Sequence, residues 1–196
     1  MPAKPARRPS RKPHNDKAVP HLWQLASQFA ARQHRHQIRK DGLTPYFSHV
    51  VRVAFTVSQL FGCHDEVVVC MALLHDTIED TTTDYDDLES NFGSTIADGV
   101  AALTKNMALK ESEREAEYDA RLAKADWRVR LVKLADTYDN FCDCVNHPAH
   151  LVEEKRLEAI DKCRRAISLA RHDAADNPSS ARAIRLVEAL IKPYAR

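Results

Sequence analysis

Residues 66–81 read EVVVCMALLHDTIEDT, an apolar run that becomes acidic within one step. The eight residues 67–74 are apolar on every side, which predicts a fully covered helix or a buried strand. On a helix that turns about 100° per residue, the polar side chains after this run would share one face. The stretch therefore predicts a wall of one imidazole and three carboxylates, namely His75, Asp76, Glu79 and Asp80.

Carboxylates gathered at the end of a core segment repel one another and lose solvation, so a cation is expected beside them. His75 and Asp76 offer one nitrogen and one oxygen ligand, and Mn²⁺ and Mg²⁺ prefer oxygen-rich mixed shells. The best candidates for further ligands are His49 and Asp136, polar residues in apolar helical patterns. Taken singly, His49 also fits a satisfied core or capping histidine, and Asp136 a capping or ion-paired aspartate.

Apolar residues recur at intervals of three and four along most of the chain, which predicts helices. The segment 39–46 contains Gly42 and Pro45 and predicts a loop. Thr83 or Asp84 is expected to cap a helix that Gly93 ends. No internal repeat or glycine-rich phosphate loop is present in the sequence, which argues against a solenoid or a nucleotide-binding α/β sheet. Helices are expected at about 22–35, 50–61, 84–92, 94–104, 113–124, 128–142, 151–172 and 180–191, with a further one at 66–80 if the apolar run is helical.

The length of 196 residues suits one domain, and the net charge of +1 gives no sign of a protein that binds bulk polyanions. Charge is nevertheless uneven along the chain. Residues 1–18 hold six basic residues and one acidic residue, a local charge of +5, whereas residues 19–196 carry −4. Four prolines and no large apolar cluster predict a disordered basic tail over 1–18, before a single domain over 19–196. A role of this tail as a non-specific nucleic-acid tether stays open.

The five cysteines are an odd number and form no CxxC pair, which predicts free thiols in a cytoplasmic protein. The tail lacks the apolar segment of a secretory signal, and no stretch approaches 18 consecutive apolar residues. We therefore expect a cytoplasmic protein with no membrane partner and no specific nucleic-acid partner.

The order His49, His75-Asp76, Asp136 resembles the HD superfamily of metal-dependent phosphohydrolases. Over about residues 22–170 the resemblance is to the RelA/SpoT-type alarmone hydrolase domain, in a stand-alone form. It implies an all-α HD-domain helical bundle of about eight to ten helices, with the motifs at 39–143 and closing helices at 151–196. The segments that carry it are RKDGLTPYFSHV (39–50), LLHDTIEDT (73–81), NFG (91–93), TKN (104–106) and VKLADTYDN (132–140).

The resemblance also implies roles for the polar residues around the metal. One Mn²⁺, or alternatively Mg²⁺ or another divalent ion, would be bound by His49, His75, Asp76 and Asp136. The attacking water would be oriented and deprotonated by Glu79 and Asp80. Apart from the resemblance, these last two residues also fit an N-cap and surface charges of the next helix.

The implied substrate contacts come from four further residues. The purine base would lie between Arg39 and Lys40, the phosphates near Lys105, and the nucleotide against Asn140. Three departures affect this region: Val50 stands where the family usually has proline, Leu43 extends the loop by one residue, and residues 137–139 replace a commonly more basic or apolar triplet.

The activity implied by the resemblance is Mn-dependent hydrolysis of the 3′-pyrophosphate of (p)ppGpp or (p)ppApp, which releases pyrophosphate and the 5′-di- or triphosphate nucleoside. Two alternatives stay open: an HD phosphohydrolase for other nucleotides, and a catalytically silent nucleotide-binding module. The closing helices are expected to serve as scaffold or as the surface of a homo-oligomer.

Overall fold

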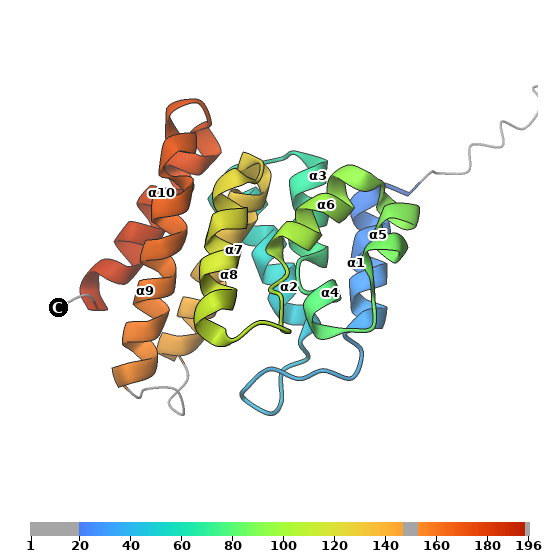
Figure 1. The fold of residues 1–196 in the computed structure, drawn as a ribbon, viewed down its shortest axis with the longest axis horizontal. Coiled ribbons are helices and arrows are strands. Elements are labelled where there is room, and N and C mark those ends of the chain that lie inside the picture. Colours follow the sequence, from blue (N-terminus) through green and yellow to red (C-terminus); the bar gives the residue numbers. More distant parts are fainter. Residues whose placement is uncertain (1–19, 147–152, 195–196) are drawn as a thin grey trace, which may run out of the picture.

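The computed structural model describes residues 20–146 and 153–194, and this part of the chain is helical without a strand (Figure 1). The all-α prediction is thus confirmed, while the predicted basic tail at 1–18 lies outside the described residues. The α-helices are α1 (Leu22–Gln33), α2 (Phe47–Phe55), α3 (Glu66–Leu74), α4 (Thr77–Asp80), α5 (Tyr85–Phe92), α6 (Ser94–Leu103), α7 (Glu111–Lys124), α8 (Trp127–Asn146), α9 (Glu153–Ala170) and α10 (Pro178–Ile191). A π-helical turn, Thr56–Leu60, extends α2, and 3₁₀ turns follow α9 (Arg171–Ala175) and α10 (Lys192–Tyr194).

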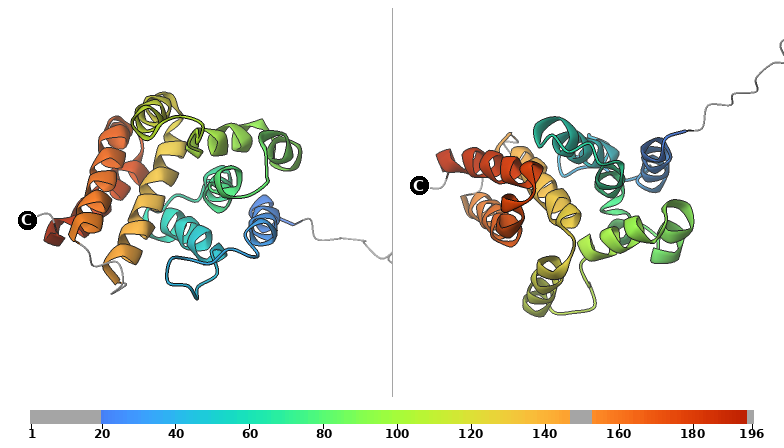
Figure 2. Two further views of the ribbon diagram at one scale, coloured as in Figure 1. Left: turned by 60° about the horizontal axis from the view of Figure 1, so that its bottom comes forward. Right: turned by 90° about the horizontal axis from the view of Figure 1, so that it is seen from above.

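Helix α8 lies between two groups of helices (Figure 2). It packs against α9 and α10 on one side and against α2 and α3 on the other. Helix α3 is the apolar helix of the quoted stretch, and α1, α2, α6 and α8 all contact it. Gly99 of α6 faces Met71 of α3, where any β-carbon would overlap the methionine side chain. Of the two alternatives predicted for residues 67–74, a covered helix and a buried strand, the structure has the helix.

Local capping chemistry sets the ends of α3 and α5. Asp65 accepts a hydrogen bond from the backbone N–H of Val67 at 2.9 Å, which caps α3. Asp84 caps α5 by accepting from the N–H of Asp87 at 2.9 Å, and Gly93 ends this helix with φ of 83°. Both ends of α5 match the sequence prediction.

The prediction of one continuous helical face from His75 to Asp80 is wrong. Helix α3 ends at Leu74, and a turn at His75 and Asp76 separates it from the short α4. The break is stabilised locally, because the His75 Nδ1 lies 2.8 Å from the Ala72 carbonyl and the Thr77 hydroxyl donates to the Leu74 carbonyl at 2.7 Å. These contacts satisfy carbonyls that a continuing helix would bond.

Boundaries elsewhere differ from the predictions by a few residues, and α8 extends to Asn146 instead of ending near Cys142. The segment 39–46 lacks helix as predicted, and the isolated bridge between Ile38 and Pro45 closes its base. None of the helices described here is long and apolar enough to cross a membrane.

Candidate metal and nucleotide site

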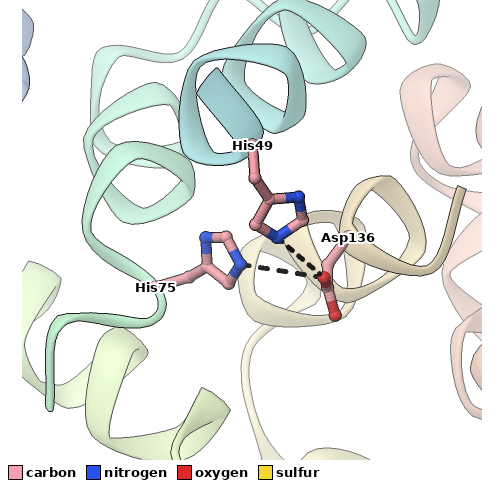
Figure 3. A group of neighbouring side chains, drawn as sticks. All are labelled: His49, His75 and Asp136. Atoms are coloured by element: carbon pink, nitrogen blue, oxygen red, sulfur yellow. Dashed lines mark ion pairs between the residues drawn. The ribbon is translucent and has the colours of Figure 1, made fainter. Parts of the chain in front are cut away.

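Three side chains far apart in the sequence point toward one another at the centre of the fold (Figure 3). His49 comes from α2, His75 from the turn after α3, and Asp136 from α8. One potential ligand atom from each lies within 4.8 Å of the others. Asp136 Oδ1 is 3.4 Å from His49 Nε2 and 3.8 Å from His75 Nε2. Two imidazole nitrogens and a carboxylate oxygen therefore surround one small volume.

Asp76 adds a second carboxylate to this group, with its Oδ2 3.0 Å from His75 Nε2 and 3.5 Å from His49 Nε2. Nevertheless, the buried Nε2 of His75 has no hydrogen-bond partner of acceptable geometry in the part of the chain that the structure describes. A buried imidazole nitrogen that faces two carboxylates but forms no hydrogen bond with either is typical of a cation-binding site. The mixed nitrogen and oxygen donors thus suit a divalent metal ion.

The neighbouring carboxylates also change the pKa values of His49 and His75. Burial opposes protonation of both imidazoles, but hydrogen bonds to Asp136, Asp139 and Asp76 raise the pKa of His49 to about 9. Burial also opposes protonation of His75, yet the Asp76 charge and the Asp136 carboxylate raise its pKa well above the usual range. The site therefore attracts positive charge, and a metal ion would compete with protons for it.

Asp136 is held in place by two further neighbours. Lys133 Nζ donates to its Oδ2 at 2.9 Å, and Asn140 Nδ2 donates to its Oδ1 at 2.5 Å. Burial raises the pKa of Asp136, but the charge of Lys133 and the nearby imidazoles of His49 and His75 bring it well below its usual value. The carboxylate is consequently ionised and oriented before any ligand binds.

A cavity of about 390 Å³ opens beside this cluster, within the range of small-molecule sites. His75, Asp76 and Asp136 line it together with the other predicted residues, namely Arg39, Lys40, Glu79, Asp80, Lys105 and Asn140. His49 lies behind them and is 1% exposed. Six basic and seven acidic side chains line the cavity, so one bound divalent cation would turn a slightly acidic lining basic.

Glu79 and Asp80 project from α4 into the same cavity. The Glu79 Oε2 accepts a hydrogen bond from the backbone N–H of Lys105 at 2.8 Å, which fixes this carboxylate against the α6–α7 connection. Burial raises the pKa of Glu79, and burial followed by the Asp76 charge raises that of Asp80. Both are therefore more basic than ordinary surface carboxylates, as a proton acceptor requires.

The four predicted nucleotide contacts are brought together, but three of them already have protein partners. Arg39 donates to Asp143 at 2.6 Å and to the Asn140 Oδ1 at 3.0 Å. Asn140 uses its other end for Asp136, so it links the arginine to the metal cluster. Lys105 Nζ pairs with Glu115 at 2.5 Å. The cationic groups are thus held in defined positions around the cavity.

Several cavity residues had not been predicted from the sequence. Tyr46 donates to Asp76 Oδ2 at 2.6 Å, and the Tyr118 ring lies 5.3 Å from both Lys105 Nζ and Lys133 Nζ. Helix α9 forms another part of the wall with Lys155, Glu158, Ala159 and Lys162, although scaffold or oligomer contacts were expected of it. Tyr46 could have been suspected from the sequence because it ends the predicted loop that contains Gly42 and Pro45. No local sequence pattern marks Tyr118 or the α9 residues.

Comparison with known proteins agrees with this geometry. A family model described as "HD domain" matches residues 26–177. A Drosophila melanogaster protein named guanosine-3′,5′-bis(diphosphate) 3′-pyrophosphohydrolase MESH1 is 40% identical over 131 residues, which are 66% of this chain and 73% of that protein. The human protein of the same name is 40% identical over 119 residues, which are 60% of this chain and 66% of that protein.

A solved structure adds a comparison of the whole fold. It is described as a metazoan orthologue of SpoT that hydrolyses ppGpp, and it superposes with a TM-score of 0.79 at 28% sequence identity. The match covers 91% of this chain and 98% of the other. The chain belongs to the HD domain family, in the branch that contains the MESH1 and SpoT-type proteins.

Proposed function

We propose that this chain is a metal-dependent phosphohydrolase that removes the 3′-pyrophosphate of guanosine or adenosine alarmones. The observation that carries the proposal is the cluster of His49, His75 and Asp136 at a cavity that also presents Glu79. The 3′-pyrophosphohydrolase relatives at about 40% identity support this substrate class over other nucleotides. The products would be pyrophosphate and the 5′-di- or triphosphate nucleoside.

In this proposal the metal is bound by His49, His75, Asp76 and Asp136. The bound ion is Mn²⁺, with Mg²⁺ as the alternative. Two imidazoles and two carboxylates suit a borderline-hard divalent ion. When bound, such an ion supplies Lewis acidity to a phosphoryl oxygen and to the attacking water. Lys133 and Asn140 would hold the Asp136 carboxylate in position throughout.

Glu79 would take the proton from the attacking water, with Asp80 orienting that water. The backbone N–H of Lys105 holds one oxygen of Glu79, so the carboxylate is positioned without being neutralised by an ion pair at that oxygen. Water would attack the phosphorus bonded to the ribose 3′ oxygen, the bond from phosphorus to that oxygen would break, and the 3′ oxygen would take up a proton. Pyrophosphate leaves intact.

Recognition of the nucleotide would fall to the basic residues that face the metal cluster. Arg39 lies with its guanidinium carbon 5.4 Å from the centre of the Tyr46 ring, a planar surface next to which a purine could stack. Lys40 would flank the purine from its other side, and Lys105 would meet the phosphates, whose negative charge the acidic residues alone would repel. We also propose a cytoplasmic location, supported by the five free cysteines.

A substrate panel tests the proposal. Purified protein is dialysed against a chelator and incubated with ppGpp, ppApp, GTP or dGTP, with and without Mn²⁺. We expect pyrophosphate release from at least one alarmone, only when the metal is present. Release from GTP or dGTP alone would favour the other class of HD phosphohydrolase, and binding of an alarmone without release would favour a catalytically silent module.

A further inference from the structure

We propose that Asp139 and Arg52 form a positioning pair that holds the imidazole of His49 ready for metal binding. The inference deepens the proposed function and rests on its metal site. Asp139 belongs to α8 and Arg52 to α2, so the pair joins the two helices that supply His49 and Asp136. Neither residue lines the cavity. An effect of Asp139 on the reaction would therefore pass through His49, which it contacts directly.

The contact between Asp139 and His49 determines which imidazole nitrogen is free. Asp139 Oδ2 lies 2.7 Å from His49 Nδ1, and the aspartate side chain is 6% exposed. An ionised carboxylate only accepts hydrogen bonds, so Nδ1 must carry the proton. In the neutral imidazole the lone pair then lies on Nε2, the nitrogen that faces Asp76 and Asp136 at 3.5 and 3.4 Å. Asp139 thus selects the tautomer that binds metal.

Arg52 holds Asp139 in this position with a two-pronged ion pair. Its Nε donates to Oδ1 at 2.6 Å and its Nη2 to Oδ2 at 2.8 Å, the fork geometry that restricts a carboxylate most strongly. The same Nη2 also reaches Asp143 at 3.0 Å. Burial raises the pKa of Asp139, but its bonds to His49 and Arg52 lower the pKa below its usual value.

The pair also accounts for a departure noted in the sequence. Asp139 belongs to the triplet 137–139, where the family pattern is commonly more basic or apolar. A buried negative charge at this position needs a partner, and Arg52 supplies one from the first turn after His49. Residues three apart on a helix share a face, so Arg52 and His49 both reach Asp139.

The variant Asp139→Asn tests the inference by its affinity for metal. The Mn²⁺ dissociation constant of the chelator-treated protein is measured from free Mn²⁺ by electron paramagnetic resonance. Loss of such a partner typically weakens metal binding about 10- to 100-fold, and we expect that loss here. We also expect saturating Mn²⁺ to restore most of the rate of pyrophosphate release, a rescue that general loss of structure would not show.

Asp173→Asn is the matched control, because Asp173 is a 6% exposed carboxylate that forms the same forked pair with Arg130 at 2.7 Å. Asp173 does not line the cavity, so its variant should keep the wild-type Mn²⁺ affinity. Arg52→Gln gives a second test should Asp139→Asn fail to fold, since Arg52 is 38% exposed. It should also weaken Mn²⁺ binding.

Mn²⁺ affinity within about twofold of wild type, in Asp139→Asn or in its substitute Arg52→Gln, would overturn the inference and leave the proposed function standing. Equal weakening in Asp173→Asn would likewise overturn it, because the effect would then follow from lost stability. A wild-type protein that binds no Mn²⁺ would overturn the proposed metal site and, with it, the inference.

Discussion

Replacing His75 by asparagine is expected to lower kcat/KM for ppGpp by about 10³-fold or more, since a lost metal contribution of several kcal/mol corresponds to such factors. Asparagine places an amide nitrogen near the position of Nδ1, so the contact with the Ala72 carbonyl can persist. The variant lacks only the Nε2 end, which has no hydrogen-bond partner among residues 20–146 and 153–194. Folding should therefore be affected much less than catalysis. Steady-state kinetics and the melting temperature of the metal-free protein measure the two effects separately.

His172→Asn is the control for this change. His172 follows α9, is 62% exposed and does not line the cavity, so its variant should keep wild-type kinetics. A His75→Asn protein with near-wild-type kcat/KM at limiting Mn²⁺ would contradict the assignment of His75 as a ligand. A collapse of the metal-free melting temperature would show that the histidine acts mainly in folding.

Replacing Glu79 by glutamine is expected to lower kcat by about 10²- to 10⁴-fold, the usual contribution of a general base. The amide oxygen can still accept from the backbone N–H of Lys105, so the side chain should keep its place. Glutamine cannot take a proton from water at neutral pH, so the loss should fall on kcat while KM and Mn²⁺ affinity change little. Kinetics at saturating Mn²⁺ measure this split.

Asp80→Asn and Glu89→Gln complete the comparison. We expect a smaller loss of kcat for Asp80→Asn than for Glu79→Gln. The Glu79 side chain is held by a hydrogen bond from the backbone N–H of Lys105, and among the described residues no backbone N–H holds the Asp80 side chain in this way. Glu89 of α5 is exposed and does not line the cavity, so Glu89→Gln should behave as wild type. A larger loss of kcat in Asp80→Asn would indicate that Asp80 takes the proton and Glu79 orients the water.

Much of the fold could be predicted because its signals are local. An apolar run marks α3 as a covered helix or a buried strand, and Asp84 and Gly93 mark the ends of α5. The break after Leu74 could not be predicted from periodicity, since it depends on His75 and Thr77 bonding carbonyls of the preceding turn. That break aims His75 at the cluster, so this local departure from a regular helix shapes the site.

The candidate site was predictable only where the residue types themselves are unusual. His49 and Asp136 stand out as polar residues in apolar helices, and the structure brings them together with His75. Tyr118 and the α9 residues carry no such mark, because their place in the cavity depends on how α7 and α9 pack. The expected homo-oligomer stays a prediction.

The net charge of the chain does not reveal how charge is distributed in the cavity. The chain as a whole is nearly neutral, at +1. The cavity is lined by acidic groups such as Asp76 and Asp136 and by basic groups such as Arg39 and Lys105. A cation bound by the acidic groups would make the cavity attractive to a small, highly charged nucleotide.

The most direct test of the central claim is hydrolysis of ppGpp in ¹⁸O-labelled water with Mn²⁺, followed by mass spectrometry of both products. We predict one ¹⁸O atom in the released pyrophosphate and none in the GDP, because water attacks the phosphorus next to the 3′ oxygen. Label in the nucleoside or release of orthophosphate in place of pyrophosphate would contradict the account, as would the absence of any product from both ppGpp and ppApp.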